Sequence, residues 1–557
     1  MRPSSHRCPV VLLCVLLFLI GCSKIQKPSD PAASKIRNRL SPNPAEFTTV
    51  HGADPILASE LLRQYYERRN FNPAWSDEHG ISASADSLVA LVKIADQEGL
   101  EPQDYHLDGI ERILGTIRSM QGNQASSDIS GRAELDLLLS DAFILYACHL
   151  SEGKVDRDSL RPRLTIGREK QQYVTMLEKA LSTQSVGQTL RSSAPGHTAY
   201  RALRGLLMSF RSQEKHQVWT HFPAGISLRP GQQGRFVFAL RSRLLALGDL
   251  SPRSGSTNDE FDSTLVDAVR VFQKRHGFET SGVADSATIA ALNVPPSNRV
   301  AQIKATMERW RWLPHALGQR HVLINIPDFR LSVVENDRVV MSMKVVLGLP
   351  AWQTPMFSSE LTQVLFNTHW MAPEDIVEKE LINYMKADTN YLPSNSMSLW
   401  RKKGDSLQRL DPHTINWREM SPEKIDFFLR QEGGPQNIMG QVKFPIPNKY
   451  NVYLHDTPYR EDFPKSVRMF SHGCIRLEKP FDLAEYVLRQ FPAWTRERID
   501  TVVARRMEQT ITLKTSIPVH VVYCTVWRGE DGSAQFREDY YGLDRRLSDI
   551  LRRPASK

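Results

Sequence analysis

The sequence predicts an α+β multidomain protein with a helical region first, a small three-helix domain next and a β-rich domain with a helical insertion last. Three observations support this prediction. The 557 residues suggest about three or four domains at the usual size of roughly 150 residues. Apolar residues follow a helical spacing of three and four up to about residue 218, and the pattern changes to a period of two beyond Arg320. Between these regions, a helical face ends at Gly248, a natural helix terminator.

The composition excludes several classes of protein. Hydrophobic residues make up 41% and charged residues 24%, so neither a disordered chain nor a multi-span membrane protein fits. Lys and Arg number 71 against 62 Asp and Glu, and the net charge of +9 is thin over this length. It does not form the dense basic stripe that nucleic-acid binding requires, so no nucleic-acid partner is expected. The six cysteines include no CxxC pair and are too few for a disulfide scaffold.

Residues 1–21 have the layout of a secretion signal. Basic residues precede the apolar run 10–20, which is too short to span a bilayer comfortably as a permanent helix. The run ends in Leu-Ile-Gly-Cys at 19–22, which resembles the lipobox of bacterial lipoproteins, where the Cys, here Cys22, is lipidated after cleavage. Ser23 resembles the class sorted to the outer membrane. The alternatives are an uncleaved anchor or a plain signal peptide with a chance Cys.

The next two regions are interpreted as a tether and a scaffold. Residues 22–51 are polar and rich in Ser, Pro and Asn, which predicts a tether from the membrane to the first folded domain. Residues 52–218 have helical periodicity, strongest at 135–150, and no catalytic cluster, which predicts structural support. Cys148 is expected to be a small buried hydrophobe; with the adjacent His149 it would make a poor metal pair, because neighbours on a helix point to different faces.

Residues 219–298 form a separate unit with three expected helices. The leucines at 240, 244, 245 and 247 make one helical face that stops at Gly248. A second helix contains Phe272 and leads to His276-Gly277-Phe278, and a third includes Leu292. This arrangement resembles the small peptidoglycan-binding domain of many cell-wall enzymes. The alternative is an ordinary three-helix spacer.

The last unit, residues 299–557, is expected to be a β domain interrupted by a cap. β-branched residues with a period of two predict strands, and the final strand is expected to return to the same sheet. The expected strands cover 322–326, 331–334, 339–347, 441–444, 451–454 and 519–526. Residues 371–440 return to helical patterns, with amphipathic segments at 376–385 and 422–429. This insertion is interpreted as a helical cap.

One cluster has the residue types for nucleophilic catalysis: Ser-His-Gly-Cys-Ile-Arg at 471–476, with Tyr-Leu-His-Asp-Thr-Pro at 453–458. A thiol attacks as the thiolate and is mostly protonated near neutral pH, so Cys474 needs an imidazole nearby. His472 is two residues away. His455 ends a predicted strand, where an adjacent strand can place it beside Cys474. Gly473 permits an unusual turn, and the backbone amide of Cys474 can point at an oxyanion.

Other interpretations of this cluster remain open on the residues alone. Cys474 can be buried filler, and His455-Asp456 can be a surface turn. His455, His472 and Cys474 are also zinc-ligand types, but no second Cys or acidic ligand lies at useful spacing. A lone thiol in an exported protein is better explained as a nucleophile. We therefore expect no metal and no cofactor.

The string at 471–476, with a His nineteen residues before the Cys, resembles the active-site signature of the L,D-transpeptidases, which have a YkuD-type catalytic domain. Further stretches are similar to the large Gram-negative, YcbB-like subgroup, so the resemblance spans nearly the whole mature chain. They are 72–75, 98–100 and 104–107 in the helical region, and 324–327, 329–331, 348, 353–355, 442–444, 447–448 and 453–458 beyond it.

The resemblance implies a peptidoglycan L,D-transpeptidase, an acyltransferase of wall biosynthesis and cell shape. Cys474 would attack the diaminopimelate carbonyl of a tetrapeptide stem, release D-Ala and form a thioester. An acceptor amine on a neighbouring stem would resolve the thioester to a 3→3 cross-link. His455 would take the thiol proton and later serve the amine. The backbone carbonyl of Asp456 would orient its ring, with participation of the Asp456 side chain as the alternative.

The resemblance also implies supporting roles around the nucleophile. Tyr453 would line the pocket, and His472, with Ser471 and Gly473, would shape the site. Arg476, where many shorter relatives carry Asn, either holds the loop or binds an acidic substrate group. The insertion would cover the acyl pocket, where three tryptophans either contact a glycan or stem peptide or only pack: Trp370, Trp400 and Trp417.

These inferences predict a lipid-anchored periplasmic enzyme at the outer membrane of a Gram-negative bacterium, with tetrapeptide stems as donor and acceptor. An L,D-carboxypeptidase, in which water resolves the thioester, is one alternative. A non-catalytic lipoprotein that tethers the wall through residues 226–295 is another, and the intact Cys474 and His455 argue against it. Cys8 and Cys14 would leave with the signal and Cys524 would be buried, which leaves one reactive thiol.

Overall fold

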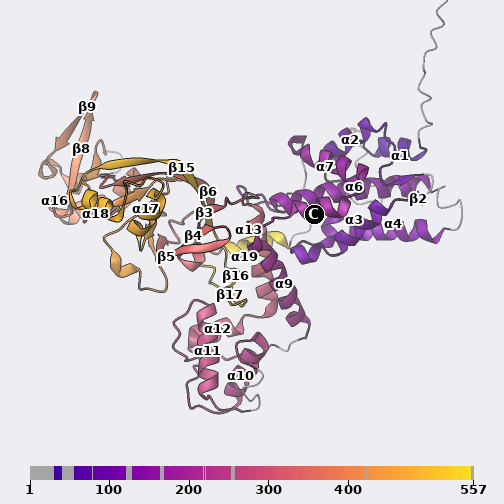
Figure 1. The fold of residues 1–557 in the computed structure, drawn as a ribbon, viewed down its shortest axis with the longest axis horizontal. Helices are drawn as coiled ribbons and strands as arrows, with labels where there is room; N and C mark the ends of the chain where they lie inside the picture. Colours follow the sequence, from indigo (N-terminus) through magenta and orange to yellow (C-terminus); the bar gives the residue numbers. More distant parts are fainter. Residues whose placement is uncertain are drawn as a thin grey trace, which may run out of the picture.

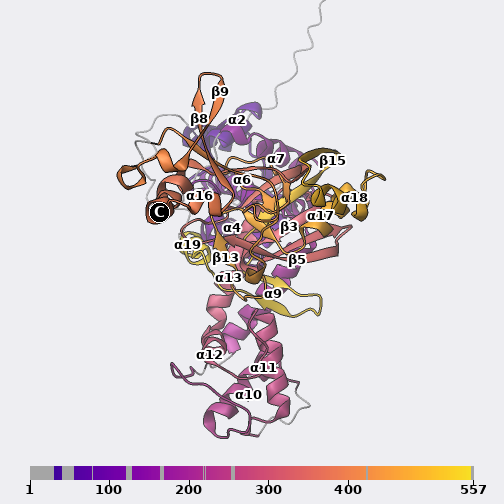
Figure 2. The ribbon, with the colours of Figure 1, turned by 90° about the vertical axis from the view of Figure 1, so that its left-hand side faces the viewer.

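The computed structural model describes residues 30–40, 55–77, 80–120, 128–163, 168–216, 219, 221–251, 258–421 and 425–552. The predicted signal 1–21 and the predicted lipidation site Cys22 lie outside these ranges. A helical region lies at one end of the long axis and a β-rich region at the other, and a small helical domain projects to one side between them (Figures 1 and 2). None of the helices in the described ranges has the length and apolar character to span a bilayer.

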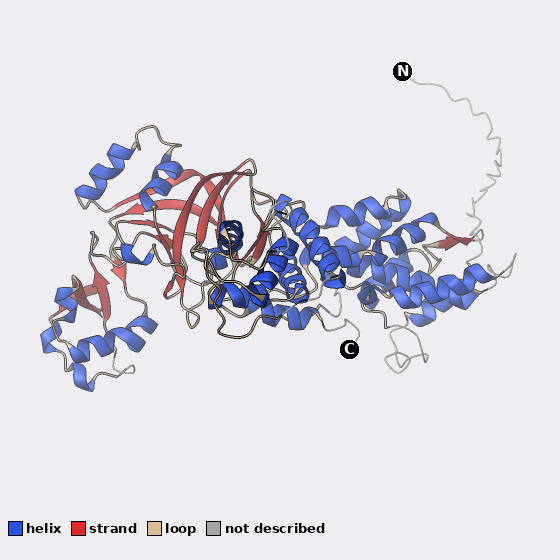
Figure 3. Cartoon of the chain, turned by 90° about the horizontal axis from the view of Figure 1, so that it is seen from below, coloured by secondary structure: helices blue, strands red, loops and turns tan. Residues whose placement is uncertain are grey.

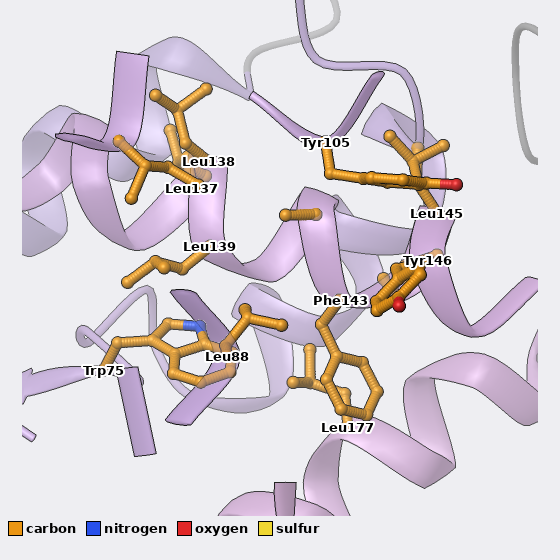
Figure 4. Close-up of a cluster of buried hydrophobic side chains, with 14 of the residues drawn as sticks. Trp75, Leu88, Tyr105, Leu137, Leu138, Leu139, Phe143, Leu145, Tyr146 and Leu177 are labelled. Atoms are coloured by element: carbon orange, nitrogen blue, oxygen red, sulfur yellow. The ribbon is translucent and has the colours of Figure 1, made fainter. Parts of the chain in front are cut away.

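The N-terminal region is built around α6 (Ile129–Glu152), as the helical pattern predicts. Nearly every residue of α6 from Leu135 to Leu150 is buried, because this helix is apolar on all sides and other helices surround it. Figure 4 shows Phe143 of α6 beside Leu177, with Trp75 and Leu88 in the same core. The surrounding elements are α2 (Ser59–Arg68), β1 (Ser76–Asp77), β2 (Gly80–Ile81), α3 (Ala83–Lys93), α4 (Leu107–Ser119), α7 (Gln172–Ser182) and α8 (Val186–Ser193).

The structure differs from the sequence prediction in part of the tether. Helix α1 (Ala32–Arg39) packs against α6, and its Ile36 is fully buried. Arg132 of α6 pairs with Asp30 just before α1 at 2.8 Å. Ala32 and Ile36 are four residues apart and so share one helix face, a local pattern that the polar average composition of the segment hides. Residues 30–39, which lie inside the predicted tether, therefore pack against the scaffold domain.

Two helices connect the regions. Helix α9 (Thr198–His216) packs along α13 (Pro296–Arg311). The small domain that lies between them in sequence contains α10 (Arg235–Leu247), α11 (Ser263–Arg275) and α12 (Ser286–Asn293) around its own core, which includes Leu240, Leu244 and Phe272. Gly248 ends α10 in the left-handed conformation with φ +79°. The predicted three-helix unit and its terminator are confirmed.

The C-terminal domain contains a nine-stranded sheet in the order β13-β5-β14-β12-β11-β6-β15-β3-β4. Because β4 also pairs with β5, the strands other than β13 close into a ring, whose curvature is visible in Figure 3. The strands are β3 (Arg320–Asn325), β4 (Arg330–Glu335), β5 (Arg338–Gly348), β6 (Phe357–Phe366), β11 (Val442–Phe444), β12 (Leu454–His455), β13 (Met469–Ser471), β14 (Ile475–Leu477) and β15 (Gln509–Val522).

The end of the chain returns to this sheet, as predicted. Strand β15 lies between β6 and β3, and residues 519–522 pair in parallel with β3. The expected strand 519–526 is interrupted after Val522, and β16 (Val526–Arg528) pairs instead with β17 (Ala534–Phe536). The helices of this domain are α17 (Pro480–Leu488), α18 (Arg496–Ala504) and α19 (Leu543–Leu551).

The insertion at 371–440 is present and contains the first predicted helical segment, whereas the second, at 422–429, is not a helix over its described residues. It contains a four-stranded antiparallel sheet in the order β7-β10-β8-β9, and β10 occupies positions expected to be helical. Buried and half-buried residues alternate in β10, and such a short apolar run does not distinguish helix from strand until a partner strand is present. The elements are β7 (Trp370–Met371), α14 (Glu374–Ile376), a π-helical turn (Val377–Leu381), α15 (Ile382–Ala387), α16 (Tyr391–Ser394), β8 (Met397–Lys403), β9 (Ser406–Leu410) and β10 (Phe428–Gln431).

Candidate active site

Strand pairing brings together the two sequence motifs singled out above. Strands β12 and β14 are parallel neighbours, with Leu454 opposite Ile475 and His455 opposite Arg476. Cys474 directly precedes β14, so it lies beside the start of β12, and the backbone amide of Ile475 donates a hydrogen bond to the carbonyl of Tyr453 at 3.1 Å. The expectation that an adjacent strand places His455 near Cys474 is thus met by this register.

The loop before Cys474 is held by buried hydrogen bonds. Gly473 has φ +108°, a conformation that side-chain-bearing residues rarely adopt. The hydroxyl of Thr354 donates to the carbonyl of Gly473 at 2.9 Å and accepts from the amide of Gly348 at 3.0 Å. The hydroxyl of Ser471 donates to the carbonyl of Cys474 at 2.6 Å and accepts from the amide of Gly473 at 3.1 Å. Ser471 therefore supports the loop rather than the reacting atoms.

The ring of His455 is buried and fixed by the main chain. Its Nδ1 lies 2.6 Å from the backbone carbonyl oxygen of Asp456, which can only accept, so Nδ1 carries the hydrogen and Nε2 is the basic nitrogen. Burial, with the positive charges of Arg476 and Lys443, lowers the pKa of His455 to about 3, although the carbonyls of Asp456 and Met439 oppose this shift. The imidazole is therefore neutral at physiological pH.

Cys474 is half-buried and lines a cavity. Its Sγ lies 3.8 Å from the backbone carbonyl oxygen of Asn451. Burial raises the pKa of the thiol above its ordinary value, and hydrogen bonds from Tyr453 and the charges of Lys443 and Arg476 oppose that rise. A raised thiol pKa beside a lowered imidazole pKa leaves both groups neutral at rest, so a proton moves only when the thiol attacks.

A lysine behind the nucleophile was not predicted as a site residue. Lys443 lies opposite His455 in the β11–β12 pair, and its Nζ is 3.7 Å from the ring centre of Tyr453. Burial raises the pKa of the Tyr453 hydroxyl, and so does the neighbouring Cys474. Tyr453 thus contacts both the lysine and the thiol, and the cation favours negative charge on sulfur through the low-dielectric interior.

The cavity over Cys474 has a volume of about 280 Å³, and the insertion supplies part of its wall. Both the catalytic domain and the cap contribute to its lining. The lining includes Trp352, Tyr450, Asn451, Tyr453, His455, Ser471, His472, Cys474 and Arg476 from the catalytic domain, and Trp370, Pro373, Asp375 and Ile376 from the cap. A larger cavity of about 650 Å³ lies among α12, α13 and α19 and contains no thiol, so the chemistry belongs to the smaller one.

His472 connects the catalytic loop to the cap. Its Nε2 lies 2.5 Å from Oε1 of Glu380, a residue of the π-helical turn. The ring also packs at 5.2 Å from Trp352, whose own face carries the ammonium group of Lys379 at 4.3 Å. His472, expected to shape the site, therefore has Glu380 as its partner. No local sequence signal indicated this contact, because Glu380 lies 92 residues upstream.

Arg476 and Asp456 have supporting contacts of their own. Arg476 is buried, lines the cavity and lies 3.6 Å from the carboxylate of Asp462, which fits the loop-holding alternative while leaving the guanidinium next to the reacting groups. The Asp456 carboxylate accepts from the backbone amide of Gln441 at 2.9 Å and lies 3.5 Å from Arg460. Its side chain braces the turn at 440–441.

The remaining candidates divide between packing and the cavity. Trp417 is buried against Phe427, and the indole of Trp400 donates to Ser398, so both pack within the cap. Trp370 is buried in the cap core and also lines the cavity. Cys148 and Cys524 are free and buried, and burial raises the pKa of each thiol to about 12.

Several residues of the site were missed as such from sequence. Thr354 bonds to the loop before Cys474, Trp352 packs against His472, and Lys443 lies over the ring of Tyr453. Thr354 and Lys443 belong to stretches that carried the family resemblance, so a signal for them existed without a role attached. Trp352 directly precedes one of these stretches. For Glu380 and Asn451 the sequence offers no comparable signal.

Comparison with known families assigns each region. Residues 319–519 match the model of the L,D-transpeptidase catalytic domain, named YkuD. Residues 233–292 match a family described as "Putative peptidoglycan binding domain", and residues 60–207 match a scaffold domain. The three matches agree with the predicted order of a helical scaffold, a small helical domain and a β-rich domain.

Three individual proteins similar to this chain share at most about a third of their residues with it over the matched region. A "Putative L,D-transpeptidase" of Haemophilus influenzae is 31% identical over 252 residues, which is 45% of this chain and 50% of that protein. The chain thus spans about half the length of this curated relative. Among solved structures, an L,D-transpeptidase from Mycobacterium smegmatis is 12% identical over 37% of this chain and 58% of that one, with a TM-score of 0.18. L,D-transpeptidase 3 from Mycobacterium tuberculosis is 13% identical over 37% and 61%, with a TM-score of 0.16.

The structural likenesses are too weak to add to the family matches. The subgroup suggested by the longer sequence stretches remains a prediction. The chain therefore contains, in this order, a region similar to a scaffold domain, a region similar to a peptidoglycan-binding domain and a region similar to the L,D-transpeptidase catalytic domain named YkuD.

Proposed function

We propose that the protein is a peptidoglycan L,D-transpeptidase with Cys474 as its nucleophile and His455 as the base for the thiol. The observation that carries this proposal is the β12–β14 register, which places both residues in one cavity of the matched catalytic domain. A free thiol, a neutral imidazole with its orientation fixed by the main chain, and a cavity wall supplied by a cap form a site suited to acyl transfer.

Acylation begins when the Cys474 sulfur attacks the diaminopimelate carbonyl of a tetrapeptide stem. The thiol proton passes to Nε2 of His455, the C–N bond to the terminal D-Ala breaks, and the amine of D-Ala takes up the proton as it leaves. Among the described residues, none accepts a hydrogen bond from the backbone amide of Cys474, so this N–H is available to the oxyanion. Arg476 and Lys443 favour negative charge on the sulfur as the thioester forms or breaks.

The thioester is then resolved by an amine of a second stem, which gives a 3→3 cross-link. The match of residues 233–292 to a peptidoglycan-binding family supports the wall polymer as the substrate. Substrate in the wall implies a periplasmic location, and the lipobox-like sequence at Cys22 supports a lipid anchor to the outer membrane. In this proposal, the lipid anchor at Cys22 holds the protein at the outer membrane while its catalytic domain acts on the wall.

The test is mass spectrometry of the intact protein incubated with purified disaccharide-tetrapeptide or with a carbapenem. We expect one acyl adduct on the wild type and none on Cys474→Ala, while binding of sacculi is retained by the variant. An adduct that persists on Cys474→Ala would overturn the assignment of the nucleophile. Products separated by liquid chromatography distinguish cross-linking from hydrolysis, so a tripeptide product alone would instead identify an L,D-carboxypeptidase.

His455→Ala is the matching test of the base. Loss of a positioned base reduces acylation by about 10²–10⁴-fold. The measured quantity is the rate of adduct growth after mixing with tetrapeptide. A variant with a near-normal rate would transfer the role of thiol base from His455 to His472.

A further inference from the structure

The cap contributes a carboxylate to the catalytic loop. Oε1 of Glu380 lies 2.5 Å from Nε2 of His472, and the two side chains are 36% and 27% exposed. Glu380 belongs to the π-helical turn Val377–Leu381, and such turns occur frequently at functional sites. Two segments far apart in sequence therefore meet at an imidazole two residues from the nucleophile.

Neighbouring contacts fix the plane of the His472 ring. Trp352 packs against the ring at 5.2 Å between centroids, and the ammonium group of Lys379 lies 4.3 Å above the indole. Lys379 and Glu380 are consecutive residues of the π-helical turn. The same turn thus holds the ring directly through a carboxylate and indirectly through Trp352, so the orientation of His472 depends on the position of the cap.

The pairing also determines which ring nitrogen is basic. An ionised carboxylate can only accept a hydrogen bond, so Nε2 of His472 carries the hydrogen and Nδ1 of the neutral ring retains a lone pair. A carboxylate on one nitrogen fixes the tautomer, which leaves the other nitrogen as the acceptor. His472 lines the same cavity as Cys474. The ring is therefore a candidate base inside the acyl pocket.

His455 is less suited to accept a proton from an incoming amine. The residue is only 3% exposed. The neighbouring cations Arg476 and Lys443 also oppose a positive charge on its ring. His472 is more exposed and has an anion as its partner. The cavity that His472 lines is also lined by the cap residues Pro373, Asp375 and Ile376.

We propose that Glu380 is a positioning residue for His472, and that this pair removes the proton from the acceptor amine during resolution of the thioester. This inference rests on the proposed transpeptidase function and moves the amine step from His455 to His472. The neutral amine attacks the thioester carbonyl carbon, and one N–H proton passes to Nδ1 of His472. An amide bond forms, the C–S bond breaks, and the thiolate of Cys474 takes the proton back from His472. Since Glu380 belongs to the cap, the base is complete only when the cap covers the pocket.

The test separates the two halves of the reaction. Wild-type protein and Glu380→Gln are first acylated with purified disaccharide-tetrapeptide, and adduct growth is followed by intact mass. An acceptor stem peptide is then added and adduct decay is followed. We expect adduct growth in Glu380→Gln to stay within about threefold of wild type, while amine-dependent decay falls by about 10–100-fold, the usual effect of losing a carboxylate behind a histidine. Glu380→Asp should restore part of the decay rate.

Glu378→Gln is the matched control, since Glu378 lies in the same π-helical turn and His472 pairs with Glu380 instead. It should show wild-type decay. Equal decay in wild type and Glu380→Gln, with normal acylation in both, would overturn the inference and leave the proposed function intact. Absence of any adduct on the wild type would instead overturn the proposed function itself. Circular dichroism spectra that match the wild type exclude misfolding of the variants as the cause of a slow decay.

Discussion

Nδ1 of His455 lies 2.6 Å from the backbone carbonyl oxygen of Asp456, whereas the carboxylate of Asp456 bonds to the backbone amide of Gln441 at 2.9 Å. The main chain therefore orients the imidazole of His455, whereas the carboxylate of Asp456 holds the backbone at Gln441. A carbonyl holds the tautomer without adding a negative charge, which accords with the low pKa of His455. This arrangement differs from a catalytic triad, in which a carboxylate faces the ring.

The first prediction follows from that arrangement. Asp456→Asn should keep the rate of acylation within about threefold of wild type, because Asn retains an acceptor for the Gln441 amide and leaves the backbone carbonyl in place. A triad carboxylate replaced in the same way loses about 10⁴-fold in rate. The measurement is adduct growth by intact mass with tetrapeptide substrate. A loss approaching the triad value would show that the carboxylate takes part after all.

The second prediction concerns the resting thiol. Since burial raises the pKa of Cys474 and lowers that of His455 to about 3, alkylation by iodoacetamide should be slow at neutral pH and should keep rising beyond pH 9. An established thiolate–imidazolium pair would instead give a plateau at neutral pH. The rate of mass increase is measured from pH 6 to about pH 10, where unperturbed thiols are largely ionised.

Lys443→Met sharpens this experiment. Removal of the cation behind Tyr453 should move the alkylation profile to still higher pH, since Lys443 favours the thiolate. Cys474→Ala should abolish labelling at position 474, and no label is expected on Cys148 or Cys524, which are buried with thiol pKa values raised to about 12. An unchanged profile in Lys443→Met would show that the lysine does not act on the sulfur.

The third prediction tests the turn before the nucleophile. A Cβ on Gly473 would meet its nearest atoms only at 3.7 Å, so Gly473→Ala has space, but φ +108° is strained for any side chain. The strain of about 1–3 kcal/mol should be relieved by a local change of the loop, which displaces Cys474 and reduces acylation by at least about tenfold. Acylation rate and thermal midpoint are measured together.

Gly404→Ala provides the comparison for Gly473→Ala. Gly404 also has positive φ, at +62°, with no atom within 4 Å of an added Cβ, and it lies in the β8–β9 hairpin of the cap. This variant should lose a similar amount of stability and retain acylation. Equal losses of activity in both variants would mean that the effect comes from general destabilisation rather than from the nucleophile turn.

The fourth prediction concerns acid stability of the scaffold. Burial lowers the pKa of His149 from 6.5 to about 3, so the folded state keeps the ring neutral while the unfolded chain binds a proton below pH 6.5. The contribution of this histidine to stability is therefore complete above pH 6.5 and is lost as pH falls toward 3. The thermal midpoint of the wild type should decrease over this interval.

His149→Gln isolates the contribution of His149. The variant should be less stable than wild type at pH 7.5 by about 1–3 kcal/mol, because Tyr105 loses its ring partner, but the difference should narrow toward pH 4. Differential scanning calorimetry at a series of pH values provides the measurement. A constant difference at all pH values would show that the pKa of His149 is the same in the folded and unfolded states, which would contradict its lowering by burial.

Much of the architecture follows from local sequence patterns. The helical spacing around Leu135 to Leu150 predicts the central helix, and the leucines before Gly248 predict a helix that ends there, because burial of one face requires that spacing. The period of two beyond Arg320 predicts the sheet. The patterns do not determine whether residues 428–431 form a helix or a strand. A short apolar run becomes a strand only when a neighbouring strand such as β8 offers hydrogen-bonding partners.

The candidate active site likewise has features that the sequence predicts and features that only the tertiary structure shows. The sequence by itself determined which candidates to consider, Cys474 in the motif at 471–476 and His455 in the motif at 453–458, because residue types and spacing indicate nucleophilic chemistry. Only the tertiary structure decided that β12 and β14 are parallel partners, that Lys443 stands behind Tyr453 and that Glu380 pairs with His472. Each of these contacts joins segments whose separation in sequence carries no periodic signal, and only the closure of the sheet and the docking of the cap bring them within hydrogen-bonding or electrostatic range.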